Sequence, residues 1–380
     1  MMSEYTLQFS SSNKDNGNFK LLELPTDLCK VVESALEGSG CPSFVIKGQP
    51  GEDAVLCTTD KTYTVRSVVL SNSMVVVTPA PASETGDANV SVEIRDQISE
   101  VLELLPTVPK LHKLESLLRG HEYDEGDIDD MYDEDEGRPT KRRRYTYEDI
   151  SNNMQASEDE LMRGLRERRI LTLNGELRPV TPAHLTAILE ILLNTLVSLS
   201  LPHDAAPTDR LVDILVQDHD MRRDVATQVM SWFGSVADDA WEMDVEAVVK
   251  EVGLGILRLH KDDPIAEGEF LQQWRKAVGD TFESSVSLQL LLGNYLSEKS
   301  MMQDLVQLKY FPASALPIEP AARFSDLFLT RDRWKADDLT PFLADIAVDS
   351  KERDKLLLKH ARALTDAEGV WYTARVKYNA

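Results

Sequence analysis

The stretch from His121 to Tyr147, HEYDEGDIDDMYDEDEGRPTKRRRYTY, constrains the fold of this chain more than any other part of the sequence. Ten acidic residues lie between Glu122 and Glu136. Such a block has no apolar period to bury and its like charges repel, so it is expected to be solvated and mobile. Residues 121–147 are therefore predicted to be a linker between an N-terminal part with strand character and a longer, mainly helical C-terminal part.

The linker carries two further signals, of opposite charge. Its acidic run fails the spacing of a calcium loop, because the position that needs a bidentate Glu, counted from Asp133, holds Arg144. After Pro139 comes a basic tetrad, which consists of Lys141, Arg142, Arg143 and Arg144. A short Lys/Arg run in an exposed linker predicts a nuclear import signal, with charge balancing of the acidic run as the alternative. The expected compartment is the nucleus.

Short runs rich in Val, Thr and Tyr predict strands in residues 1–120. The expected strands are Ser43–Ile46, Ala54–Thr58, Tyr63–Leu70, Met74–Thr78 and Val92–Val101, and Thr26 is expected to cap a helix that ends at Leu36. Because no long helices separate these strands, a small β-barrel or sandwich-like domain is expected. An exposed edge of such a strand set suits strand addition by a partner. The candidate partner-binding residues are Val55, Leu56, Tyr63, Val65, Val68, Val75, Val76 and Val77.

After the linker the hydrophobic period becomes helical. Ser157–Glu160 has the form of a capping box, and Asn174-Gly175 predicts a tight hairpin between residues 170 and 180. Further helices are expected at His184–Leu201, Asp209–Gln217, Arg222–Phe233, Val245–Leu257, Ile265–Val278, Ser287–Glu298, Arg323–Leu329, Lys335–Asp345 and Asp349–Leu364, with a terminal strand at Gly369–Val376. This order predicts an array of about three winged-helix domains, at residues 148–244, 245–319 and 320–380, and an α+β protein as a whole.

The distribution of charge points to the C-terminal end as the place for a nucleic-acid contact. The formal net charge of −24 argues against a protein that coats DNA through bulk charge. Residues 320–380 are the exception, with eleven basic and ten acidic side chains. The DNA-binding candidates are Arg323, Arg331, Arg333, Lys335, Lys351, Lys355, Lys359, Arg362, Arg375 and Lys377. Lys351, Lys355, Lys359 and Arg362 are expected to share one helical face that contacts phosphates, and an ordinary solvated face is the alternative.

Signals for catalysis are absent from the sequence. The chain has no GxxxxGK[ST], HExxH or GxSxG motif, so neither an enzyme nor a cofactor is predicted. Gly253-Leu254-Gly255 falls in a helical pattern and predicts close helix packing. The tryptophans are expected in packing rather than in stacking platforms for bases. Three cysteines without CxxC spacing indicate a reducing compartment, and no apolar run is long enough to span a membrane.

Two separated blocks resemble one known family. DAVLCTTDKTYTVRSVVLSNSMVVV (Asp53–Val77) is similar to the N-terminal signature of the sister chromatid cohesion protein DCC family. LPIEPAARFSDLFLTRDRWKADDLTPFLADI (Leu316–Ile346), followed by LLKHAR (Leu357–Arg362), looks like the final domain of the same family. The resemblance covers both ends of the chain well and the middle loosely.

The resemblance implies a non-catalytic subunit of the alternative, replication-factor-C-like clamp loader, which acts on the sliding clamp in DNA replication. The implied partners are a small chromosome-transmission-fidelity subunit and the C-terminal tail of the large loader subunit, which together complete a β-barrel assembly. The winged helices would extend to DNA, and the module would tether the loader to the catalytic subunit of DNA polymerase epsilon. The alternative function is that of a winged-helix transcription factor, which needs side chains free to read base edges.

Overall fold

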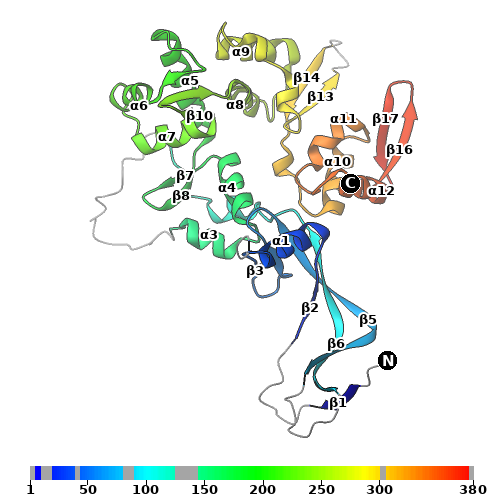
Figure 1. Cartoon of the computed structure of the whole chain (residues 1–380). Coiled ribbons are helices and arrows are strands. Elements are labelled where there is room, and N and C mark those ends of the chain that lie inside the picture. The colour runs from blue at the N-terminus through cyan, green and yellow to red at the C-terminus, as the bar shows by residue number, and fades with distance from the viewer. Residues whose placement is uncertain are drawn as a thin grey trace, which may run out of the picture. The chain divides into compact units, whose positions relative to one another are not determined.

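The structure is a computed structural model that describes residues 5–9, 19–38, 43–79, 90–124, 144–299 and 305–375. Two compact units make up the chain. Unit 1 contains Met1–Pro109 and Asn153–Glu160, and unit 2 contains Lys110–Asn152 and Leu161–Ala380. The predicted mixture of an N-terminal sheet with C-terminal helices is confirmed (Figure 1).

The described part of unit 1 contains one six-stranded sheet, in the order β1-β6-β5-β4-β3, with β2 also paired to β6. Its strands are β1 (Tyr5–Phe9), β2 (Leu21–Glu23), β3 (Val45–Lys47), β4 (Val55–Cys57), β5 (Thr62–Pro79) and β6 (Val90–Pro106). β4 pairs with the first three residues of β5, whereas β1 pairs with Val90–Ile94 near the opposite end of the β5–β6 pair. These ends are separated by about fifteen residues of strand, on the order of 50 Å, so the outer strands of the sheet do not meet.

The expected barrel or sandwich is therefore corrected to an open sheet within the described residues. Its central feature is the long antiparallel pair of β5 and β6, here called the ribbon (Figure 1). The two predicted strands Tyr63–Leu70 and Met74–Thr78 are one strand, because an irregularity between Val69 and Met74 carries the chain past the polar Ser71-Asn72-Ser73 without ending the pairing with β6.

Helix α1 (Thr26–Leu36) has the predicted bounds. The predicted cap is wrong, since Pro25 occupies the N-cap position and Thr26 is already helical. Leu28 on α1 joins Leu56, Tyr63 and Leu104 in the core of unit 1. This cluster holds α1 against one face of the sheet at the end of the ribbon where β4 also pairs.

Asn153–Glu160 is remote in sequence but belongs to unit 1. The side-chain amide of Gln155 donates to the carbonyl of Asp53 at 2.6 Å, and Lys47 Nζ donates to the carbonyl of Ala156 at 2.8 Å. The Ser157 N–H donates to the Thr62 hydroxyl at 2.9 Å. The predicted capping box is confirmed: Ser157 N–H donates to Glu160, and Glu160 N–H donates to the Ser157 hydroxyl.

The predicted hairpin is also confirmed, in the first part of unit 2. The elements there are α2 (Lys113–Leu117), β7 (Ile170–Leu173) and β8 (Glu176–Pro179), together with most of α3 (Tyr147–Asn153) and of α4 (Glu158–Glu167). The last residue of α3 and the first three residues of α4 belong to unit 1. Asn174 and Gly175, between β7 and β8, have φ values of 51° and 83°. Both values lie in the left-handed region that Asn and Gly tolerate, which is the reason that this dipeptide forms the turn.

Within the described residues 182–374, one order of elements occurs three times: a helix, a short strand, further helical turns and a hairpin. Repeat 1 contains α5 (Pro182–Ser198), β9 (Ala206–Pro207), α6 (Thr208–Gln217), α7 (Arg223–Trp232), β10 (Gly234–Ala237) and β11 (Ala240–Met243). Repeat 2 contains α8 (Val245–Arg258), β12 (Ile265–Ala266), α9 (Glu267–Val278), η1 (Glu283–Ser285), η2 (Leu288–Leu291), β13 (Tyr295–Lys299) and β14 (Val306–Tyr310). After η3 (Ala313–Ala315), repeat 3 contains α10 (Pro320–Thr330), β15 (Arg333–Lys335), α11 (Ala336–Leu339), η4 (Thr340–Leu343), α12 (Ser350–His360), β16 (Ala361–Asp366) and β17 (Gly369–Ala374).

The three repeats also share one sheet topology. In the orders β10-β11-β9, β12-β14-β13 and β15-β17-β16, the second strand of the hairpin is central and the short first strand pairs with it. Each repeat has a tryptophan that is at most 1% exposed: Trp241, Trp274 or Trp334. Their Nε1 groups donate to backbone carbonyls at 2.8–2.9 Å, which satisfies the buried indole. These tryptophans are core residues, as predicted.

Two predicted helices are wrong at their C-terminal ends. Ser287–Glu298 contains only the short η2 and then enters strand β13. Asp349–Leu364 is helical only as far as His360, and β16 begins at Ala361. In both cases local apolar spacing fits a helix, but pairing with a strand later in the chain decides the outcome.

Candidate functional site

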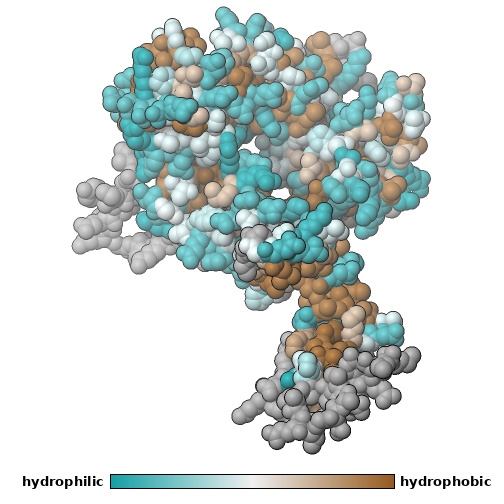
Figure 2. All heavy atoms as spheres, viewed as in Figure 1, coloured by the Kyte–Doolittle hydropathy of each residue, from teal (hydrophilic) through white to brown (hydrophobic). Residues whose placement is uncertain are grey.

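The ribbon of unit 1 exposes a row of apolar side chains (Figure 2). On β5, Val69 is 80% exposed and Val75 is 50% exposed, and Val68, Met74 and Val77 are also open to solvent. β-branched residues favour an extended strand, which explains why the segment forms β5, but solvent exposure of so many of them is unfavourable. Exposed apolar surface of this kind is typical of interaction sites on proteins.

One edge of the ribbon has no strand neighbour among the described residues. β1 and β2 both lie along the outer edge of β6. On the outer edge of β5, β4 reaches only Thr62–Thr64, and the Val65 N–H donates to the carbonyl of Ala54. From Arg66 to Pro79 this edge presents backbone groups for strand addition next to the apolar side chains.

The structure divides the predicted partner-binding residues into three groups, which are buried, half-buried and exposed. Val55, Leu56 and Tyr63 are at most 4% exposed and form part of unit 1's own core, so their assignment to a partner surface is corrected. Val65 and Val76 are half-buried. Val68, Val75 and Val77 are exposed, as a docking surface requires. Val69 and Met74 are also exposed but were not predicted as contacts. Their signal in the sequence is their position in the same β-rich run, on either side of the predicted break at Ser71–Ser73.

In repeat 3, the basic face of α12 is formed by three lysines. Lys351, Lys355 and Lys359 are exposed and follow each other at intervals of four residues, which places them on one side of the helix. Arg362, predicted to share this face, lies on β16 instead. The Asp349 side chain caps the helix by accepting from the Glu352 N–H at 2.8 Å. This cap stabilises the first turn of α12, where Lys351 lies.

Arg323 is not available to a nucleic acid in this structure. Its side chain is fully buried, it pairs with Asp345, and its guanidinium donates to the carbonyls of Pro317 at 2.6 Å and Phe342 at 2.8 Å. Its assignment as a DNA contact is therefore corrected: the charge is used inside repeat 3, where a buried guanidinium requires a full set of acceptors.

The other predicted DNA contacts occupy varied positions in repeat 3. Arg331 donates to the carbonyl of Ser297 at 2.6 Å and lies over the Trp334 ring. Arg333 pairs with Asp366 and lies over Trp371. Lys335 is half-buried on β15, and Arg375 donates to the carbonyl of Leu358. Lys377 lies outside the described residues.

Only one member of the predicted import signal can be placed. Lys141, Arg142 and Arg143 lie outside the described residues, and Arg144 pairs with Glu176 at 2.8 Å while remaining 72% exposed.

In the described part of the chain, no group of three His, Cys, Asp or Glu side chains has the geometry to hold a metal ion. No described helix has both the length and the apolar character needed to cross a membrane.

The chain is thus a mixed α+β protein, with an open sheet in unit 1 and helical repeats in unit 2. A family model described as sister chromatid cohesion protein Dcc1 matches residues 19–343. The chain belongs to this family, whose members are involved in sister chromatid cohesion and are named for that process and not for a catalysed reaction.

Curated relatives cover nearly the whole chain. Sister chromatid cohesion protein DCC1 of Mus musculus is 28% identical over 369 residues, which cover 94% of this chain and 88% of the relative. The Homo sapiens protein of the same name is 25% identical, with 91% and 86% covered. The Saccharomyces cerevisiae protein is 20% identical, with 94% and 96% covered. Both units of the structure therefore fall within the similarity.

Proposed function

We propose that this chain is a non-catalytic adaptor subunit of an alternative, replication-factor-C-like clamp loader, which acts on the sliding clamp in DNA replication and sister chromatid cohesion. Membership of the Dcc1 family supports the link to cohesion. The observation that carries the proposal is the ribbon, because an unpaired strand edge beside exposed valines is a surface for assembly rather than for catalysis. The chain contacts the sliding clamp indirectly, through the other loader subunits.

In this proposal, the small chromosome-transmission-fidelity subunit and the C-terminal tail of the large loader subunit supply the missing strands. They pair with the edge of β5 between Arg66 and Pro79 and cover valines on the ribbon. The experiment is co-expression of the full chain with both partners, followed by co-purification. The double variant Val75→Lys with Val77→Lys should reduce recovery of both partners at least tenfold, because it puts two charges where the partner strands pack.

A matched control separates a charge effect from the loss of a docking surface. Asn72 lies on the same strand and is exposed, so Asn72→Lys adds a charge without removing an apolar side chain. It should keep both partners. Equal loss with Asn72→Lys, or full recovery with the double variant, would place the assembly surface elsewhere.

The three repeats are winged-helix domains in this proposal, and the third contacts DNA. Their order of helix, short strand, helices and hairpin supports the assignment. Lys351, Lys355 and Lys359 on α12 meet phosphates, since the lysine ammonium is a point charge that suits a phosphate oxygen. The array then helps to tether the catalytic subunit of DNA polymerase epsilon in the nucleus.

DNA binding is tested by changing the three α12 lysines together to Glu. Loss of three phosphate contacts should reduce the slope of log affinity against log salt by about 2–3. The control changes Lys250, Lys261 and Lys276, which lie in repeat 2, to Glu and so alters the net charge equally. Binding that falls equally in both triple variants would indicate bulk charge only, and footprints confined to one sequence would favour a transcription factor.

A further inference from the structure

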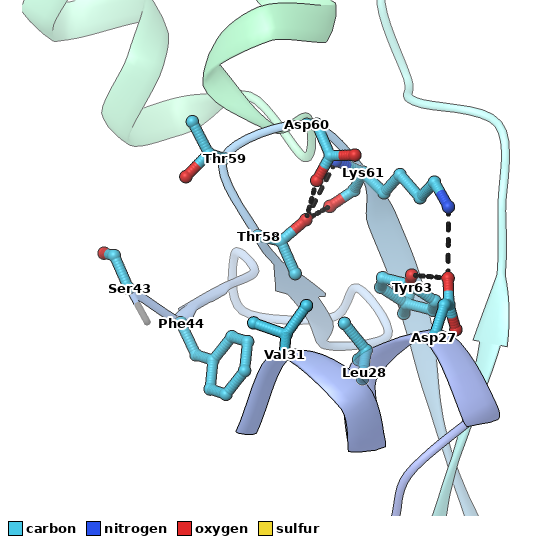
Figure 3. Close-up of a pocket in the computed structure, with 10 residues that line it drawn as sticks. All are labelled: Asp27, Leu28, Val31, Ser43, Phe44, Thr58, Thr59, Asp60, Lys61 and Tyr63. Carbon is cyan, nitrogen blue, oxygen red and sulfur yellow. Dashed lines mark hydrogen bonds and ion pairs between the residues drawn. The ribbon is translucent and has the colours of Figure 1, made fainter. Parts of the chain in front are cut away.

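A pocket of about 200 Å³ opens in unit 1, between α1, the residues before β3 and the turn that joins β4 to β5 (Figure 3). Leu28 and Val31 on α1, together with Phe44, form its apolar wall. Thr58 and Asp60 on the turn form its polar side. The pocket does not belong to the proposed assembly edge of β5, because its one β5 residue, Tyr63, lies in the stretch that β4 already pairs.

The apolar wall is partly open to solvent. Phe44 is 37% exposed and Val31 is 44% exposed, whereas Leu28 beneath them is buried. Figure 3 shows Val31 and Leu28 pointing from α1 toward the turn that carries Thr58. Such a wall gains stability when the aliphatic part of another side chain covers it.

The acidic groups of the pocket differ in their partners. Asp27 Oδ2 accepts from the Tyr63 hydroxyl at 2.8 Å and from Lys61 Nζ at 3.0 Å. Asp60 accepts only from the Thr58 hydroxyl, at 2.9 Å, among the described residues. Asp27 therefore has its own cation, whereas the Asp60 carboxylate forms no ion pair within this part of the chain. The pocket thus has an acceptor suited to a cation at its rim.

A second feature lies next to the pocket. Ser43 and Phe44 lead directly into β3, which pairs with β4 on one side, from Val45 opposite Cys57 to Lys47 opposite Val55. The other edge of β3 has no strand neighbour in the described residues. Ile46 on this short strand is 71% exposed. An extended segment that continues along this edge would run beside Ser43 and Phe44, which line the pocket.

We propose that this pocket binds an arginine side chain of a partner protein, carried on an extended segment that adds as a strand to the free edge of β3. The aliphatic stem of arginine covers Val31 and Leu28, and its planar guanidinium stacks on the Phe44 ring. The guanidinium donates to the carboxylate of Asp60, which is the rim acceptor without a cation. A carboxylate side chain is disfavoured by Asp27 and Asp60, and an apolar side chain leaves Asp60 without a new partner.

The first part of the test is selection of a displayed library of random twelve-residue peptides on the full chain. Arginine should be enriched at one position, with β-branched residues at alternate flanking positions, because these favour strand addition. Selected peptides are then synthesised with a fluorescent label, and their affinity for the full chain is measured by anisotropy. Replacing the enriched arginine by citrulline, which has nearly the same shape and no charge, should weaken binding.

The second part uses variants of the chain. Asp60→Asn keeps the size of the side chain and should weaken the peptides about threefold to fivefold, the effect of one exposed ion pair. Asp53→Asn is the matched control, since Asp53 is an exposed carboxylate outside the pocket, and it should leave affinity unchanged. Phe44→Ala should also weaken binding, and circular dichroism verifies that each variant is folded.

Several results would overturn the inference. They are the absence of arginine enrichment, equal effects of Asp60→Asn and Asp53→Asn, and peptides that lose binding to Val75→Lys instead, which would place them on the ribbon. Tighter peptide binding after the basic tetrad Lys141–Arg144 is changed to Gln would assign the pocket to this chain's own linker. None of these outcomes bears on co-purification of the clamp-loader partners.

Discussion

Residues 320–380 are close to neutral in an otherwise acidic protein, and their basic side chains were expected to contact DNA. Arg323 departs most from this expectation. It is fully buried in repeat 3, and its guanidinium reaches Asp345 and several backbone carbonyls, including those of Pro317 and Phe342. The charge is therefore a structural tie between α10 and the segment that follows η4.

Replacing Arg323 with Met should destabilise the full chain by about 3 kcal/mol or more, because buried carbonyls lose their donor while the apolar stem is kept. Urea unfolding monitored by tryptophan fluorescence measures the change. Arg353→Met is the control: within the described residues Arg353 pairs with its exposed neighbour Asp354 alone, so the change there should be within about 0.5 kcal/mol. Similar losses for the two variants would contradict the structural role of Arg323.

Gly253 on α8 illustrates close packing that the sequence signalled correctly. A Cβ at this position would lie 2.5 Å from Trp274 Cε2, and Trp274 is itself held by a hydrogen bond to the Val249 carbonyl. Gly253→Ala should therefore cost about 1–3 kcal/mol of unfolding free energy. Gly268→Ala, where nothing lies within 4 Å, should leave stability unchanged or raise it by up to about 1 kcal/mol. The opposite order in thermal melts would rule out this packing.

Asp27 should make the stability of unit 1 depend on pH. Burial acts to raise the pKa of Asp27, but hydrogen bonds from Tyr63 and Lys61 outweigh it and leave the pKa below its usual value. A carboxyl whose pKa is lower when folded stabilises the protein above its unfolded pKa of about 3.9 and loses this effect as pH falls through the folded value. The difference in unfolding midpoint between wild type and Asp27→Asn should thus be present at about pH 6 and shrink toward about pH 3. A constant difference would refute the linkage.

At the scale of elements, the ribbon is the part of the described fold that has a long unpaired strand edge. Among the described residues, the outer edge of β6 pairs with β1 at Val90–Ile94 and with β2 at Val101–Glu103, while the outer edge of β5 has no strand neighbour from Arg66 to Pro79. A long, apolar, unpaired edge pairs with copies of itself when no partner is present. We therefore expect the isolated chain to associate with copies of itself through this edge.

Val69, 80% exposed on the ribbon, gives a test of this association. Val69→Lys should reduce concentration-dependent light scattering of the isolated chain, because a charged edge residue opposes strand pairing between copies. Val236 in the hairpin of repeat 1 is 54% exposed, so Val236→Lys makes the same chemical change away from the ribbon. It should leave the scattering as it is. If Val69→Lys and Val236→Lys reduce the scattering equally, the association depends on exposed valines in general and not on the strand edge.

At the scale of the whole molecule, unit 1 is discontinuous in sequence. It needs Asn153–Glu160, whose side chains and backbone satisfy Lys47, Asp53 and Thr62. A fragment of residues 1–120 lacks these contacts. It should be less soluble than residues 1–160 even when both partners are co-expressed, because the Thr62 hydroxyl and the Asp53 carbonyl lose their partners. Soluble yield measures this difference, and equal yields would show that the segment is dispensable.

The sequence by itself determined what depends on neighbouring residues. Helix α1, the Asn174-Gly175 turn, the capping box at Ser157 and the order of sheet before helices were all predicted, because period, caps and turn residues act within a few positions. The resemblance at Asp53–Val77 and Leu316–Ile346 was sufficient for the family. The sequence located the β-rich run that forms the candidate assembly surface. It did not determine which valines of that run face solvent.

Only the tertiary structure decided what depends on remote contacts. It joined two predicted strands into β5, turned the end of a predicted helix into β13, and brought Asn153–Glu160 to unit 1. It also buried Arg323 and Tyr63 while leaving Lys355 and Val75 exposed. The physical reason is that burial and strand pairing are set by which distant segments meet, and residue type alone carries little information about that.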